Sequence, residues 1–221
     1  MSAPSPRRGR RNAEGESREV EEAILAAMQE LLAHRRFEDI SVADILSAAG
    51  VSRASFYFYF ESRHAVLAVL VRRAVAHGHE AAQPWLTHGE DEPPTAEVRR
   101  GIEDGARLWR ENAPVLRAIV ENWRSHPELT ALWLELMDSF TRATEQRIAR
   151  DRQAGVAPDG PEDLHTLASL LTWVGERAYY LAAIGQEPFD DEQRLVDGLT
   201  ELWRGAVYRL PPETTSRPRP H

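Results

Sequence analysis

The stretch ISVADILSAAGVSRASFYFYFESRHAVL, residues 40–67, decides how the N-terminal part of the chain folds. Ser41 followed three residues later by Asp44 has the form of a capping box, which begins a helix. Gly50 interrupts this helix, and Ser52 can cap a second short helix that contains the run of Phe and Tyr. Two short helices joined by a few residues that include a glycine are typical of a helix-turn-helix.

Around this stretch, apolar residues recur every three or four positions, which predicts amphipathic helices. Prolines stand where several of these helices would begin, a position that proline tolerates. The sequence has no strand pattern and no internal repeat. We therefore predict an all-α fold, whose further helices cover residues 16–35, 62–83, 95–112, 114–125, 128–153, 161–184 and 190–208.

The composition of the 221 residues excludes several classes of protein. No run approaches the roughly 20 apolar residues of a membrane helix, and the basic, Pro-rich start has no apolar stretch like that of a secretory signal. Cys is absent, which excludes disulfides and thiolate metal sites and is consistent with a cytoplasmic location. We expect no metal and no cofactor.

The net charge of −8 argues against a nucleic-acid partner, but the charge is unevenly distributed. Residues 1–80 contain 11 Arg and 11 acidic residues, whereas residues 81–221 contain 16 Arg and 24 acidic residues. The acidic half is therefore not expected to touch phosphates. Near the N-terminus, Arg7, Arg8, Arg10 and Arg11 form a basic tail, which is either a solvated, disordered end or a contact to the DNA backbone.

The helix-turn-helix stretch also resembles the DNA-binding signature of the TetR family of bacterial repressors. The shared features are Ser41-Val42, the turn Ala48-Ala-Gly-Val-Ser52, Tyr57, Phe60 and the pair Ser62-Arg63. The segment Gly175-Glu-Arg177 is similar to mycobacterial members of this family. The sequence departs from the usual pattern with Tyr59 in place of His, Glu61 in place of Pro, Arg63 in place of Lys and His64 in place of Glu.

The resemblance implies a helix-turn-helix domain over residues 16–61 and a larger helical ligand-binding and dimerisation domain over 62–209, with disordered tails at 1–15 and 210–221. At the start of the recognition helix, Arg53 can reach a guanine, while tyrosine hydroxyls and Arg63 suit phosphates. The expected DNA-binding residues are Ser41, Ser52, Arg53, Ala54, Ser55, Tyr57, Tyr59 and Arg63. The intervening Phe56, Phe58 and Phe60 are expected to pack in the core.

The second half of the chain is rich in Trp and other aromatic residues, with polar residues between them at helical spacing. Such residues are either a packed core or the lining of an apolar pocket with a few convergent polar groups. The candidates for a ligand pocket are Trp109, Trp133, Met137, Phe140, Thr144, Thr172, Trp173, Glu176, Tyr180 and Trp203.

The last two predicted helices have more apolar residues than a single core-facing side would contain. This indicates either that they are buried or that they contact a partner subunit. In the TetR family these helices pair across a twofold axis. The expected dimer contacts are Leu181, Leu195, Leu199 and Leu202.

Enzymatic functions have little support, because the sequence has no Gly-x-Ser-x-Gly elbow, no Gly-rich phosphate loop and no His-Glu-x-x-His. We expect a ligand-responsive repressor, a homodimer that binds a palindromic operator and is released by a small apolar effector. The alternatives are a DNA-binding regulator without an effector, or a helical carrier or enzyme for an apolar substrate.

Overall fold

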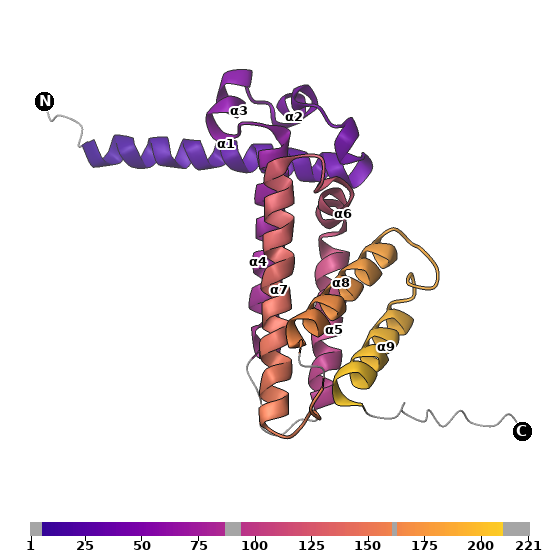
Figure 1. Ribbon diagram of the computed structural model, residues 1–221. Helices are drawn as coiled ribbons and strands as arrows, with labels where there is room; N and C mark the ends of the chain where they lie inside the picture. Colours follow the sequence, from indigo (N-terminus) through magenta and orange to yellow (C-terminus); the bar gives the residue numbers. More distant parts are fainter. Residues whose placement is uncertain (1–5, 87–93, 161–162, 210–221) are drawn as a thin grey trace, which may run out of the picture. The chain divides into compact units, whose positions relative to one another are not determined.

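The computed structural model describes residues 6–86, 94–160 and 163–209, and every regular element within these ranges is helical. This confirms the predicted all-α fold. Figure 1 shows the elements in chain order: α1 (Pro6–His34), η1 (Phe37–Asp39), α2 (Val42–Ala49), α3 (Arg53–Tyr59), α4 (Arg63–Leu86), α5 (Pro94–Glu111), α6 (Ala113–Asn122), α7 (Pro127–Gln153), α8 (Leu164–Ala183), α9 (Glu192–Trp203) and η2 (Arg204–Tyr208). No helix among these residues is long and apolar enough to cross a membrane.

The chain divides into two compact units, with the division passing within α4 and α7. The first unit comprises residues 1–75 and 112–133, and the second comprises residues 76–111 and 134–221. The expected domain boundary at residues 61 and 62 differs from this division, because the start of α4, α6 and the start of α7 belong to the same unit as the helix-turn-helix.

The first unit is built on α1, which packs against α2, α3 and α6. Ile24 and Met28 of α1 are fully buried, as are Ile45 of α2 and Phe56 of α3. At the surface, Arg73 of α4 binds Glu22 of α1 through two bonds, of 2.7 Å from Nη1 and 2.8 Å from Nη2. The three N-terminal helices are therefore held by a common apolar core, and α4 is joined to α1 by a bidentate ion pair.

The N-terminal helix is longer than expected. Helix α1 begins at Pro6 and not near residue 16, so residues 6–15, which were expected to be disordered, continue the helix. Arg, Ala and Glu are good helix formers, and the two glycines of this segment do not interrupt the helix. The side chains of the basic tail, like the whole of residues 1–5 and 210–221, lie outside the described residues.

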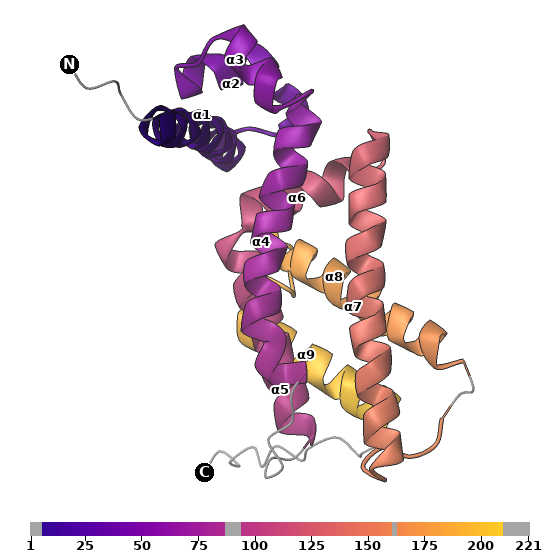
Figure 2. The same ribbon diagram turned by 90° about the vertical axis from the view of Figure 1, so that its left-hand side faces the viewer.

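In the second unit, α8 and α9 lie side by side and both pack against α5, as Figures 1 and 2 show. Their core includes Ile102 of α5, Leu171 and Ala178 of α8, and Trp203 of α9. Gly105 of α5 leaves room for a tyrosine of α8: a Cβ at this position would stand 2.6 Å from the hydroxyl of Tyr179, which donates a hydrogen bond to the carbonyl of Ile102.

A cluster of charged side chains is buried in the second unit. Arg147 of α7 is fully buried, and its Nε donates to both carboxylate oxygens of Asp151, at 3.1 and 3.0 Å. Its Nη2 donates to Glu97 of α5 at 2.5 Å, and the hydroxyl of Tyr208 in η2 donates to Asp151 at 2.6 Å. The cluster therefore joins three segments that are distant in sequence, and each carboxylate has a donor.

We expect Arg147→Met to lower the free energy of unfolding by about 3–5 kcal/mol, because it leaves the carboxylates of Glu97 and Asp151 buried without a cation. Urea unfolding followed by circular dichroism measures this loss. Arg142→Met is the control, since its exposed ion pair with Asp138 on the same helix should contribute at most about 1 kcal/mol. Equal effects of the two substitutions would contradict the assignment of the cluster.

Candidate functional site

Helix α2 begins and ends at the residues that the sequence predicts. Ser41 and Asp44 form the capping box, with the Ser41 amide donating to the Asp44 carboxylate at 2.7 Å and the Asp44 amide donating to Ser41 Oγ at 3.2 Å. Hydrogen bonds from Ser41 and Arg35 hold the pKa of Asp44 well below its usual range. Helix α2 ends at Gly50, whose φ of 66° lies in the left-handed region that favours glycine.

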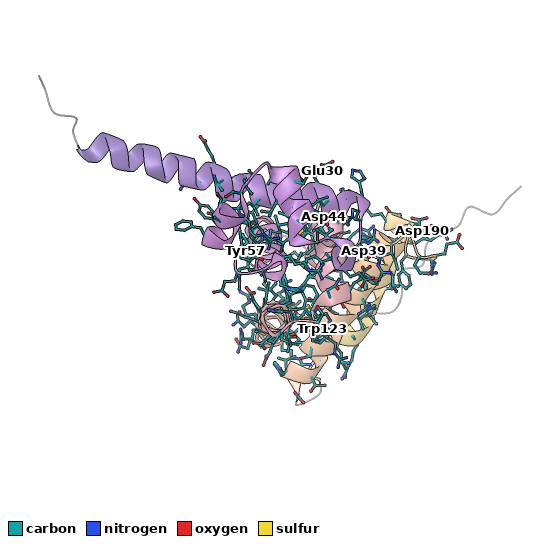
Figure 3. All side chains as sticks on the ribbon, turned by 90° about the horizontal axis from the view of Figure 1, so that it is seen from above. Glu30, Asp39, Asp44, Tyr57, Trp123 and Asp190 are labelled. Carbon is teal, nitrogen blue, oxygen red and sulfur yellow. The ribbon has the colours of Figure 1, made fainter. Side chains whose placement is uncertain are left out.

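Helix α3 has a capped start, one buried side and one exposed side. Ser52 Oγ accepts the amide of Ser55 at 3.0 Å, which caps the first turn. Phe56 points into the core and is fully buried, and its ring lies 6.1 Å from that of Phe60. On the other side, Arg53 is exposed and Tyr57 is 48% exposed (Figure 3, where Tyr57 is labelled). The short helix therefore presents a continuous surface to solvent.

Phe58 was expected in the core, and this expectation is wrong. Its side chain is 78% exposed, more than that of any other large apolar residue described. Positions two apart on a helix point to nearly opposite sides, so Phe58 faces away from the core when Phe56 faces it. Phe60 returns to the core because it follows the helix in extended conformation. The exposed face of α3 therefore contains an apolar side chain that is not among the expected DNA-binding residues.

Arg63, expected to bind a phosphate, has a prominent contact inside the protein. Its Nη1 donates to the backbone carbonyls of Phe37, at 3.0 Å, of Glu38, at 3.1 Å, and of Ile40. Its guanidinium also lies 4.8 Å from the centre of the Phe37 ring. The side chain thus joins the start of α4 to the turn between α1 and α2, so that its loss is expected to affect folding as well as any contact to DNA.

Next to Arg63, two histidine rings stack within the first unit. The rings of His64 in α4 and His126, which directly precedes α7, lie 4.3 Å apart and nearly parallel. Burial, together with the charges of His126 and Arg63, lowers the pKa of His64 to about 4. The ring of His64 is therefore neutral near pH 7 and can stack without charge repulsion.

The candidate ligand residues are distributed over both units. Trp133 belongs to the first unit, whereas the other nine belong to the second. Trp109 stacks on Tyr179 with ring centres 6.4 Å apart, and Trp203 is part of the hydrophobic core. Met137 and Thr144 are buried on α7. Tyr179, the neighbour of the candidate Tyr180, lies against Gly105 of α5, and a sequence does not show that this glycine makes room for it.

Two of the candidate ligand residues on α8 have buried polar atoms with no partner. Glu176 is 6% exposed, and neither of its carboxylate oxygens has a hydrogen bond to any described residue. Thr172, one helical turn earlier, has a buried hydroxyl that is also without a hydrogen bond. Burial raises the pKa of Glu176, although the charge of Arg177 opposes this effect. Most buried polar groups in proteins are hydrogen-bonded, so these two require an explanation.

Two of the four expected dimer contacts, Leu195 and Leu199 of α9, are buried in the core of the second unit with Trp203. Their apolar stripe packs against α5 and α8 of the same chain. Leu202 is 43% exposed and Leu181 is half-buried. The exposed apolar residues of this region also include Leu170 and Val174 of α8, and Ile184 directly after α8.

Comparisons with protein families match both parts of the chain. Residues 24–70 match the model described as bacterial regulatory proteins, tetR family. Residues 98–209 match the model described as transcriptional regulator EthR, C-terminal domain. The first match includes the whole helix-turn-helix, and the second covers α7, α8, α9 and η2 and most of α5.

Whole-chain relatives agree with these matches. The chain is 34% identical over 209 residues to the HTH-type transcriptional regulator EthR of Mycolicibacterium smegmatis, covering 95% of each chain. It is 33% identical over 201 residues to EthR of Mycobacterium tuberculosis, covering 91% of this chain and 93% of the relative. The chain belongs to the TetR family of bacterial regulatory proteins.

Solved structures with the same fold are found at low sequence identity. Salmonella enterica GusR aligns with a TM-score of 0.66 and 15% identity, covering 85% of this chain and 95% of that chain. The TetR family regulator PfmR from Thermus thermophilus aligns with a TM-score of 0.63 and 20% identity, covering 83% and 96%. These similarities concern the fold alone.

Family membership establishes the general function of this TetR protein. It is a DNA-binding transcriptional regulator of the EthR type, and the expectation that it is not an enzyme is confirmed by the regulators to which it is related. The expected DNA-binding residues remain predictions. In this chain, Arg63 replaces the Lys that is common in the family, and its planar guanidinium lies 4.8 Å from the centre of the Phe37 ring, a contact that suits a guanidinium better than an ammonium.

We expect Phe58→Ala and Phe56→Ala to have opposite effects. Phe58→Ala should change the free energy of unfolding by less than about 0.5 kcal/mol and weaken operator binding, because an exposed apolar side chain on a recognition helix can contact thymine methyl groups. Phe56→Ala should cost about 3–5 kcal/mol of stability, because it opens a cavity in the core. Urea unfolding and fluorescence anisotropy with operator DNA measure the two effects, and unchanged DNA binding by Phe58→Ala would exclude this contact.

Arg53 and Arg63 provide a second matched pair. Arg53→Ala should leave stability unchanged and cost about 1–3 kcal/mol of operator affinity, mainly at one base position. Arg63→Ala should cost about 1–3 kcal/mol of stability, because it removes the side-chain donor to the carbonyls of Glu38 and Ile40. Arg63→Lys, which keeps the charge, should restore only part of this stability. Full recovery by Lys would mean that the charge, and not the geometry of the guanidinium, is required.

Proposed function

We propose that this TetR-family protein is a ligand-responsive repressor that binds a palindromic operator as a homodimer. The observation that carries this proposal is the exposed face of α3, where Arg53, Ala54, Tyr57 and Phe58 face solvent on a helix whose other side is anchored by Phe56. A helix anchored in this way can enter a major groove without rearrangement.

The residues of this face suit different parts of the DNA. Arg53, in the first turn, can donate two hydrogen bonds to a guanine, which is the most common specific contact in the major groove. The hydroxyl of Tyr57 suits a phosphate oxygen. Ser41 is a weaker candidate for a phosphate, since its hydroxyl already bonds the negatively charged carboxylate of Asp44 at 2.5 Å. Base contacts from Arg53 and Phe58 would therefore determine the sequence that is bound.

A homodimer follows from the way in which such motifs read DNA. One chain has one helix-turn-helix and reads one half-site, so a palindrome requires two chains. Exposed apolar side chains on neighbouring helices supply a candidate surface, namely Leu170 and Val174 of α8, Ile184 directly after α8, and Leu202 of α9. Large exposed apolar areas on soluble proteins often mark interfaces, which supports the burial of these side chains against a second copy.

The effector is proposed to bind in the second unit, among the aromatic and polar residues of α5, α7 and α8. Its binding would favour an arrangement of the two chains in which the recognition helices no longer match successive grooves. A differential affinity of a few kcal/mol is sufficient for such a shift. The buried polar atoms of Thr172 and Glu176, which have no partner, support a ligand site there.

Binding to DNA from the region upstream of the gene, measured by fluorescence anisotropy and footprinting, tests this function. We expect a protected palindrome and release by a compound that also raises the melting temperature, since a ligand of the folded state stabilises it by mass action. Operator binding without any stabilising compound in a broad library would favour a regulator without an effector. Failure to bind upstream DNA would overturn the repressor proposal.

The dimer surface has its own test in Leu170→Arg, where the leucine is 60% exposed. This variant should stay folded, run as a monomer in light scattering at micromolar concentration and lose operator binding. Leu134→Arg is the control, because Leu134 is 44% exposed on α7, outside the proposed surface. Leu199→Glu should instead unfold the second unit, because Leu199 is buried. A dimeric Leu170→Arg protein would place the dimer contact elsewhere.

A further inference from the structure

Helix α8 contains a buried acid that the rest of the described chain does not neutralise. Both oxygens of Glu176 are inaccessible to solvent and neither accepts a hydrogen bond. The hydroxyl of Thr172, which lies on the same face one turn earlier, is in the same situation. A buried polar group without a hydrogen-bond partner destabilises the folded protein. A carboxylate and a hydroxyl in this situation one helical turn apart therefore indicate a binding partner that the described chain does not supply.

The neighbouring cation does not compensate for this charge. Nε of Arg177 lies 3.8 Å from Oε2 of Glu176, which is beyond hydrogen-bond length. Arg177 is adjacent to Glu176 on the helix, its side chain is 53% exposed, and its guanidinium lies 5.0 Å from the centre of the Tyr180 ring. It is therefore directed toward solvent and Tyr180, while the carboxylate of Glu176 is directed into the protein.

Two other buried acids of this unit have a partner that Glu176 lacks. Asp151 is even less exposed than Glu176 and Glu97 is equally buried, yet both bind the guanidinium of Arg147. Asp151 also accepts the hydroxyl of Tyr208. Among the described residues of the second unit, one internal cation therefore neutralises the buried acids Glu97 and Asp151, whereas Glu176 has no hydrogen bond.

The surroundings of Glu176 on α8 are aromatic. Trp173 precedes it by three positions, and Tyr179 and Tyr180 follow it by three and four, so these side chains flank the carboxylate along the helix. The pKa of Tyr179 is raised by burial and by the charge of Asp104 on α5, which indicates an environment that disfavours further negative charge. A carboxylate beside aromatic rings is the usual setting for an organic cation.

We propose that Glu176 and Thr172 bind the positively charged head of the effector, a primary ammonium or amidinium group on an apolar body. The carboxylate accepts charge-assisted hydrogen bonds from the cation, the Thr172 hydroxyl accepts another, and the aromatic residues of α8 contact the apolar part. This inference rests on the proposed effector site and narrows its ligand from an apolar compound to an amphipathic cation.

Two probes with the same apolar chain, decylammonium and decanol, test this assignment on the full-length protein. Binding is measured by Trp fluorescence and by the shift in melting temperature. The wild type should bind decylammonium about ten- to a hundredfold more tightly than decanol, which is the range of a charge-assisted hydrogen bond to a buried carboxylate. Glu176→Gln, which preserves the shape of the side chain, should abolish this preference and leave decanol binding unchanged.

Two further variants separate a specific effect from a general one. Glu187→Gln removes the same charge from an exposed position after α8 and should keep the preference for decylammonium. Thr172→Val, a nearly isosteric change that removes the unpaired hydroxyl, should reduce the preference without loss of stability. The Thr172→Val variant keeps the proposal testable if Glu176→Gln does not fold.

Equal affinities of the wild type for the two probes would overturn the inference, and so would an unchanged preference in Glu176→Gln or a lack of response to either probe. None of these results would affect operator binding, which is measured separately by anisotropy with upstream DNA. A protein that binds its operator and is released by a neutral compound would leave the proposed repressor function intact and exclude the cationic effector.

Discussion

The contact on which the DNA-binding unit depends is the one between Arg63 and the turn that follows α1. One nitrogen of this side chain donates to carbonyls of Phe37, Glu38 and Ile40, and the guanidinium lies over the Phe37 ring. Helices α2 and α3 lie in the sequence between Ile40 and Arg63, the two sides of this contact. The contact therefore closes the loop that contains the helix-turn-helix, and it limits how far α2 and α3 can shift relative to α1.

Within this closed loop, the position of α3 follows from local chemistry. Ser52 caps its start, Phe56 anchors its inner side, and the extended conformation of Phe60 ends it. A helix of this length is not stable alone, because too few internal hydrogen bonds form to offset nucleation. Its stability comes from Phe56 and Phe60 in the core, so the residues on its exposed side are not needed for folding and can contact DNA. The exposure of Phe58 is consistent with such a division.

The sequence was sufficient for features that depend on neighbouring residues, such as the capping box at Ser41 and the end of the helix at Gly50. It did not show which aromatic residue of α3 faces solvent, or whether the apolar stripe of α9 is covered by its own chain or by a partner. Arg63 contacts carbonyls 23 to 26 residues away, and backbone acceptors leave no signature in a sequence. Helical spacing was enough to name Glu176 as a candidate ligand residue. Its lack of a donor was not predictable, because this depends on every side chain around it.

The balance of charge in the N-terminal part shows how a chain with a net negative charge can bind DNA. Residues 1–80 have as many acids as Arg, so attraction to phosphates depends on which charges are paired. Among the described residues, Glu22 binds Arg73, Asp44 binds Arg35 and Glu38 binds Arg36. Arg53, at the exposed start of α3, has no such acidic partner there. These three pairs offset part of the acidic charge of this region, while Arg53 lies exposed at the place where a base edge would be read.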